Sequence, residues 1–175
     1  TEEEFEIIKK HTTYGYEILR ESDELSAYSK LIALTHHERY DGKGYPLGIS
    51  TDQIHEYSMI VSIADVYDAM TSDRIYRKRV KISEAIEYLI GLSHYNFDYN
   101  LVRSFIEHIT VYPIGTCILL NTKQKAIVVD INKKFPIRPI IRIITDEDGN
   151  MLKEFIEVDL TKNNSLVIID TIENI

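Results

Sequence analysis

The sequence predicts an α+β protein: an all-helical bundle over residues 1–110, followed by a small antiparallel β subdomain over residues 111–175. In the first part, apolar residues recur three and four positions apart, as in amphipathic helices. The second part consists of short runs rich in Ile and Val, separated by turn compositions such as NTKQK and DEDGN. The pattern changes after Tyr112-Pro113, close to the predicted boundary between residues 110 and 111.

Five helices are expected in the first part. They are bounded by capping residues and carry apolar faces at helical spacing; the first begins with Thr1 and Glu4, which match a capping box. The expected ranges are about 1–20, 22–37, 55–72, 83–92 and 98–109.

Five antiparallel strands are expected in the second part, enough for a small sheet or barrel. They are the runs TCILL (116–120), AIVVDI (126–131), PIIRIIT (139–145), KEFIEVD (153–159) and SLVIID (165–170).

Length and composition bound the function. The chain has 175 residues, 44% of them hydrophobic and 27% charged, which is ordinary for a soluble globular protein. Its net charge of −8 argues against general binding to DNA or RNA, and no apolar run approaches the roughly 20 residues of a membrane span. The one cysteine, Cys117, fits a reducing compartment, and the missing initiator Met indicates a piece of a longer protein.

The stretch HHERYDGKGYP, residues 36–46, is the first candidate functional site. His36 and His37 end a predicted helix, where two imidazoles can simply interact with the helix dipole. Gly42, Gly44 and Pro46 then restrict the backbone to a tight loop, and loops of this kind usually position functional groups. The pair is therefore a candidate metal-binding site.

Two further residues are candidate ligands. His11 shares a helical face with apolar residues, so a core histidine is the alternative to a ligand. Asp65 lies with Asp68 on a mostly apolar helix, where a carboxylate needs a compensating charge; a salt bridge or a cap is the alternative to a metal. Imidazole and carboxylate ligands together suit iron, manganese, zinc or nickel, and a two-metal centre would suit phosphodiester hydrolysis.

A cationic run follows Asp65. Five Lys or Arg residues lie within residues 74–81, and a solvated surface is the ordinary explanation for such a run. Arg74 and Arg77 lie three residues apart, so in a continuing helix they would share one side and could hold a phosphate. Lys43, between the loop glycines, could add one more cation.

These motifs resemble a known family. HHERYDGKGYP, followed by SIADVYDAMTSDRIYRKR and preceded by IKKHTTYGYEIL, closely resembles the HD-GYP domain, a branch of the HD phosphohydrolases. The resemblance covers about residues 1–110 and implies an HD-type helical bundle. The β-rich tail resembles an extension that often follows such domains.

The resemblance implies roles for individual residues. It assigns metal binding to His11, His36, His37 and Asp65, with the last three as the catalytic set. It assigns substrate binding to Arg74 and Arg77, and we expect Lys43 and Tyr45 to contribute to it. The loop that shapes the site is Gly42, Gly44, Tyr45 and Pro46.

The resemblance also implies a reaction and partners. Family members hydrolyse the bacterial second messenger cyclic di-GMP with two or three metal ions, often iron or manganese, and zinc or nickel are the other metals that these ligands suit. Signalling proteins of the GGDEF type could dock on the loop. A cytoplasmic location in a bacterium is expected, and apolar surface on the first and third predicted helices favours a homodimer.

One departure from the family pattern bears on activity. No His-Asp dipeptide occurs in the chain, although the family uses this pair for a histidine ligand and a bridging aspartate. We expect the pair to lie upstream of Thr1, and the 175 residues alone to bind metal weakly or partially and not to hydrolyse the nucleotide. The alternative is a degenerate, non-catalytic HD-GYP module that binds nucleotide or a partner protein.

Overall fold

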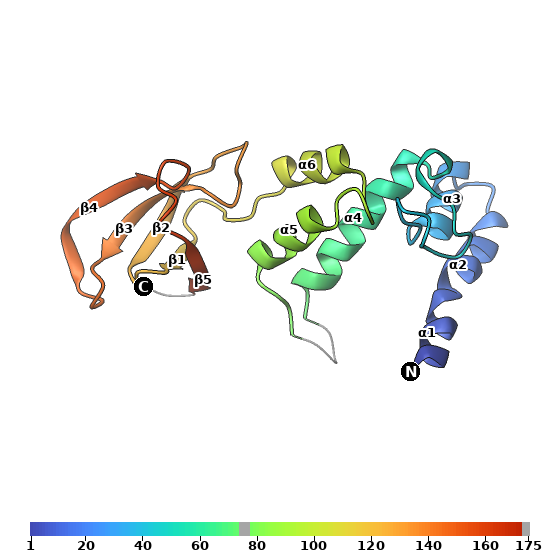
Figure 1. Ribbon diagram of the computed structural model, residues 1–175, viewed down its shortest axis with the longest axis horizontal. Helices are drawn as coiled ribbons and strands as arrows, with labels where there is room; N and C mark the ends of the chain where they lie inside the picture. The colour runs from blue at the N-terminus through green and yellow to red at the C-terminus, as the bar shows by residue number, and fades with distance from the viewer. Residues whose placement is uncertain (74–77, 173–175) are drawn as a thin grey trace. The chain divides into compact units, whose positions relative to one another are not determined.

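A computed structural model describes residues 1–73 and 78–172, and Figure 1 shows helices followed in chain order by strands. The chain divides into two compact units, Thr1–Phe105 and Ile106–Ile175. The predicted fold class, a helical bundle followed by a small antiparallel β subdomain, is confirmed.

The described helices are short, except for the fourth. They are α1 (Glu2–Lys9), α2 (His11–Arg20), α3 (Ala27–Thr35), the 3-10 helix η1 (Thr51–Gln53), α4 (Glu56–Thr71), α5 (Ile82–Gly91) and α6 (Tyr99–His108). None of these helices is both long and apolar enough to cross a membrane.

The first predicted helix is in fact two helices. The capping box at Thr1 and Glu4 is present, but α1 ends at Lys9 and α2 begins at His11. The second predicted helix corresponds to α3 and starts later than predicted, because the side chain of Ser26 accepts a hydrogen bond from the backbone N–H of Ser29 and caps α3 there.

The core of the helical unit holds α4, α5 and α6 in place. Ile63 of α4, Ile86 and Leu89 of α5 and Val102 of α6 are almost fully buried. A buried hydrogen bond of 2.8 Å between the hydroxyls of Thr35 and Ser58 joins the end of α3 to α4. This bond fixes the start of the histidine loop on the longest helix of the unit.

The second unit contains a five-stranded antiparallel sheet in the order β4-β3-β2-β1-β5. Its strands are β1 (Cys117–Leu120), β2 (Lys125–Asp130), β3 (Ile140–Thr145), β4 (Met151–Asp159) and β5 (Ile168–Ile172).

Burial alternates along the central strands. Ile118 and Leu120 of β1, Ala126 and Val128 of β2 and Ile141 of β3 are fully buried, each two residues from the next on its strand. The period of two puts these side chains on one face of the sheet, which forms the core of the unit.

Candidate metal centre

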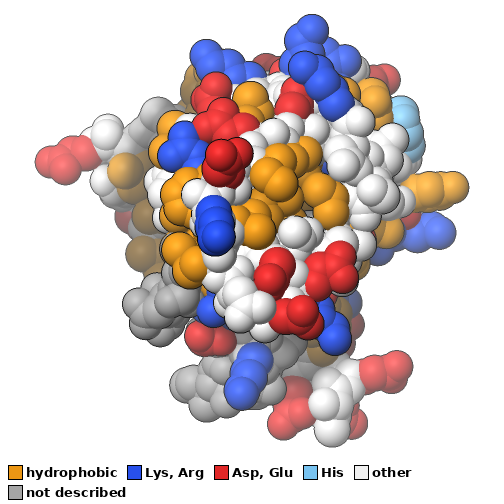
Figure 2. Space-filling model, turned by 90° about the vertical axis from the view of Figure 1, so that its left-hand side faces the viewer, with side chains coloured by type: hydrophobic (Ala, Val, Ile, Leu, Met, Phe, Trp, Pro, Cys, Tyr) orange, Lys and Arg blue, Asp and Glu red, His pale blue; other side chains and the backbone are white. Residues whose placement is uncertain are grey.

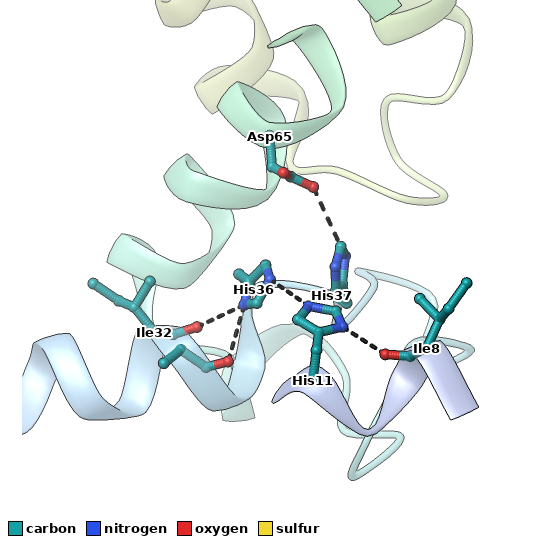
Figure 3. Close-up of polar contacts among 7 residues, drawn as sticks. Ile8, His11, Ile32, His36, His37 and Asp65 are labelled. Atoms are coloured by element: carbon teal, nitrogen blue, oxygen red, sulfur yellow. Dashed lines mark hydrogen bonds and ion pairs between the residues drawn. The ribbon is translucent and has the colours of Figure 1, made fainter. Parts of the chain in front are cut away.

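Three imidazoles come together in the helical unit (Figure 3). His11 opens α2, whereas His36 and His37 directly follow α3. One ring nitrogen from each of the three lies within 4.8 Å of the others. His11 is exposed in the described chain rather than buried in its core.

Backbone carbonyls fix the tautomers of two of these rings. His36 Nδ1 lies 3.0 Å from the carbonyl oxygens of both Ile32 and Ala33, and His11 Nδ1 lies 2.8 Å from that of Ile8. A carbonyl oxygen only accepts hydrogen bonds, so both Nδ1 atoms must carry the proton. In the neutral rings, both Nε2 atoms therefore have a free lone pair.

The two lone pairs face each other. His11 Nε2 and His36 Nε2 are 3.2 Å apart, the contact that a dashed line marks in Figure 3, and two neutral acceptors cannot hydrogen-bond to each other. A cation between them removes the conflict. Two nitrogens bound at about 2.1–2.2 Å to one ion, at right angles or slightly wider, would be roughly 3.0–3.5 Å apart. In metal-binding histidines the other ring nitrogen usually donates a hydrogen bond to a carbonyl or carboxylate. His11 and His36 have this arrangement, so these residues fit a metal ion.

His37 keeps its lone pair over the whole physiological range. Burial, with a further contribution from His36, lowers the pKa of His37 to about 4, although Asp65 acts in the opposite direction. Its Nδ1 atom lies 4.0 Å from Oδ2 of Asp65, too far for a direct hydrogen bond. Neutral imidazole is the form that binds metals.

Asp65 reaches the cluster from α4, and its side chain is 41% exposed. It is thus a partly solvated carboxylate beside three imidazoles rather than a deeply buried one. Asp68, one turn on, is exposed and accepts a hydrogen bond from the hydroxyl of Ser72 at 3.1 Å. That contact belongs to the end of α4, whereas Asp65 faces His37.

The loop after the histidines depends on two glycines. A Cβ on Gly44 would lie 2.4 Å from the backbone nitrogen of Arg39 and 2.5 Å from the carbonyl oxygen of His37, so only glycine fits. Gly42 adopts φ +74°, a left-handed conformation that also favours glycine. The backbone N–H of Tyr45 then donates to the His37 carbonyl at 3.2 Å. The loop therefore folds back directly onto the histidine.

Glu38 holds this loop together, and the sequence did not reveal it. The residue is only 3% exposed, and its carboxylate accepts hydrogen bonds from the backbone N–H groups of Leu47 at 2.6 Å and Ile49 at 3.1 Å. The only signal in the sequence is an acidic residue just before a Gly- and Pro-rich loop with backbone N–H groups to satisfy.

Tyr45 lies against the cluster. Its ring centroid is 4.7 Å from that of His37 and 6.4 Å from that of His11. Burial, aided by the charge of Asp65, raises the pKa of Tyr45 to about 12, so the phenol keeps its proton. Lys9 of α1 places its ammonium 5.7 Å from the same ring centroid, a cation that the sequence did not single out.

The predicted phosphate-binding residues are only partly described. Arg74 and Arg77 lie outside the described residues. Lys43 is exposed, and its backbone N–H donates to Asp41 Oδ1 at 3.1 Å. Within the part of the chain that the structure covers, no hydrogen bond or ion pair joins the Lys43 ammonium to the histidines.

Comparison with known families supports both units. Residues 1–101 match the family described as HD domain, and residues 117–174 match the KOW domain associated with HD domain.

Three curated relatives are all named cyclic di-GMP phosphodiesterase. One from Pseudomonas aeruginosa is 32% identical over 82% of this chain and 34% of its own length. One from Borreliella burgdorferi is 36% identical over 82% of this chain and 38% of its own, and one from Thermotoga maritima is 42% identical over 61% and 29%. The chain thus spans about a third of the length of these relatives.

Proposed function

We propose that this chain, which belongs to the HD domain family and to its HD-GYP branch, carries part of the active site of a metal-dependent phosphodiesterase that hydrolyses cyclic di-GMP. The observation that carries the proposal is the distance of 3.2 Å between the Nε2 atoms of His11 and His36, whose rings are each oriented by a backbone carbonyl. The names of the relatives supply the substrate.

The proposed metal ligands are His11, His36, His37 and Asp65. Iron and manganese are the first candidates, and zinc and nickel also accept this mixture of nitrogen and oxygen ligands. Two or three ions are proposed for the complete domain. When bound, such ions neutralise charge on the phosphate and lower the pKa of a bound water.

The chain's own residues orient the substrate and handle protons. The Asp65 carboxylate lies partly solvated beside His37, and with His36 and His37 it forms the proposed catalytic set. The Tyr45 phenol keeps its proton and can donate to a phosphate oxygen, since its pKa is raised to about 12.

The proposed substrate contacts come from the cationic residues and the loop. Lys43, Arg74 and Arg77 supply positive charge for the two phosphates, and the loop of Gly42, Gly44, Tyr45 and Pro46 closes one side of the site. We further propose a cytoplasmic location, docking of GGDEF-type proteins on that loop and self-association of the chain.

The alternative function is a non-catalytic module that binds the nucleotide or a partner protein. The observation in its favour is that no His-Asp dipeptide occurs in the 175 residues, so this chain lacks the bridging aspartate of the family pattern. Such a module would still use the loop and the cationic residues, but it would leave the phosphodiester bond intact.

The test compares the 175-residue chain with a longer chain that includes any native residues preceding Thr1. Both proteins are supplied with manganese or, anaerobically, with iron, and are assayed for metal content, nucleotide binding and release of the linear nucleotide. Turnover by the longer chain, abolished by His36→Ala, supports the phosphodiesterase. Nucleotide binding without turnover in both proteins supports the module.

A further inference from the structure

Strand β4 is an edge of the sheet in the second unit. It is nine residues long, Met151–Asp159, and among the described residues it is paired only with β3. Its other side therefore presents backbone N–H and C=O groups that a further strand can bind. The strand contains no proline, so nothing in its covalent structure blocks such pairing.

The side chains of β4 are unusually exposed for a strand. Residues 153–157 are all exposed, and Phe155 and Ile156 show 52% and 53% of their surface to solvent. Figure 2 views the molecule from the side on which Figure 1 places β4, and apolar side chains gather there between acidic and basic ones. A mixed apolar and charged edge of this kind is suited to a partner with the complementary pattern.

We propose that this partner is a second copy of the same chain, whose β4 pairs antiparallel with β4 around a two-fold axis at Phe155. In that register, Lys153 of each copy lies opposite the partner's Glu157, and Leu152 lies opposite the partner's Val158. Phe155 meets its own counterpart at the centre. Opposite charges and paired apolar side chains are the combinations that stabilise neighbouring strands.

Neighbouring registers are less complementary. Two residues that lie directly opposite each other in an antiparallel pair point to the same face of the sheet. A two-fold axis between the two strands must therefore lie midway between the two copies of one residue. An axis at Glu154 would oppose two carboxylates. An axis at Ile156 would oppose Phe155 and Glu157 and would place Leu152 against Leu160, which is fully buried in its own unit.

The charges of β3 extend the pairing. Arg142 of β3 lies opposite Glu157 of β4, and its Nε donates to the Glu157 carboxylate at 3.2 Å. The partner's Lys153 would approach that carboxylate from the other side, which gives a row of alternating charge across three strands. The two sheets of five strands would become one sheet of ten.

Cysteine cross-linking tests the register in the 175-residue chain. In a Cys117→Ser background, Phe155→Cys should form a covalent dimer under mild oxidation, because directly opposed Cα atoms are about 4.5–5.5 Å apart, within disulfide range. Lys153→Cys and Ile156→Cys serve as controls and should cross-link far more slowly. Equal rates for all three variants, or none for Phe155→Cys, would overturn the proposal.

Charge reversal tests the complementarity. Lys153→Glu opposes like charges twice per dimer, so we expect it to weaken self-association by roughly 10- to 100-fold in sedimentation equilibrium. Lys134→Glu, the same charge change in an exposed loop, should leave self-association unchanged. Mixing the Lys153→Glu chain with a Glu157→Lys chain should restore a heterodimer, since both contacts are then complementary again.

Two outcomes contradict the proposed interface. The first is an unaltered chain that sediments as a monomer at every concentration up to the millimolar range. The second is a dimer that Lys153→Glu leaves intact, which would place the contact elsewhere on the chain. Circular dichroism of each variant confirms that its fold is retained, and the cross-linking result stands even if Glu157→Lys, which loses its contact with Arg142, does not fold.

Discussion

Glu38→Gln should loosen the loop beside the histidines without unfolding the chain. The Glu38 carboxylate is 3% exposed, and its two oxygens accept the backbone N–H groups of Leu47 and Ile49 separately. A glutamine of the same shape keeps one acceptor oxygen but turns the other position into an NH2 donor. One backbone N–H would then face a donor in a site that solvent hardly reaches.

The energetic cost follows from those two contacts. Losing one hydrogen bond to a charged group costs about 1.5–3 kcal/mol, and a buried donor left without a partner adds about 1–3 kcal/mol. The lower ends add up to about 2.5 kcal/mol, which is roughly a 70-fold change in the equilibrium for local opening. The effect should be confined to the loop, because the carboxylate contacts no backbone N–H group outside it among the described residues.

Hydrogen exchange measured by NMR checks this prediction directly. The amides of Leu47 and Ile49 should exchange roughly 70-fold faster or more in Glu38→Gln, whereas the amide of Ile141 in the sheet should keep its rate. Glu24→Gln, the same change at an exposed site, is the control. If the amides of Leu47 and Ile49 changed less than about threefold, the carboxylate would not be holding the loop and this reasoning would be wrong.

Three more predictions concern the same unit. Gly44→Ala should destabilise the chain by about 1–3 kcal/mol or more in thermal unfolding, because the new Cβ would lie 2.4 Å from backbone atoms. Gly91→Ala is the control and should not destabilise the chain, because a Cβ there would have nothing within 4 Å. His36→Ala should abolish the rise in melting temperature that manganese gives the parent chain, and His94→Asn should preserve it; equal rises would remove His36 from the metal site. In a protein that binds the nucleotide, Arg74→Ala should weaken binding about ten-fold or more with metal content unchanged, and unchanged affinity would assign this arginine to the solvated surface.

The fold was largely predictable from periodicity, because the Ile- and Val-rich runs and the helical stripes are each bounded by recognisable turns. The break between α1 and α2 was not. The side chains of His11 and Thr12 hydrogen-bond to the carbonyls of Ile8 and Lys9, which a continuous helix would give to backbone N–H groups. The spacing of apolar residues does not change at this break, so the sequence predicted one helix instead of two.

The candidate site was predictable to the extent that it is a sequence motif. His36, His37 and the loop glycines lie within nine residues of one another. His11 and Asp65 were candidates from their helical faces, and the resemblance to a family assigned them to the same site. Glu38 and Lys9 escaped notice because their roles depend on which backbone and ring atoms the fold brings near them. A single acidic or basic side chain among many has no distinguishing spacing.

The same contacts that separate α1 from α2 also orient the proposed metal ligands. The His11 ring donates to the Ile8 carbonyl at the junction, and this contact both ends the helical pattern and turns the Nε2 lone pair towards His36. His36, at the end of α3, is oriented in the same way by carbonyls of its own helix. Because helix ends supply free carbonyls, placing both histidines there orients two lone pairs without any additional side chain. The mutual repulsion of those lone pairs is the local cost that a bound cation would offset, so the helix boundaries and the proposed metal site depend on the same hydrogen bonds.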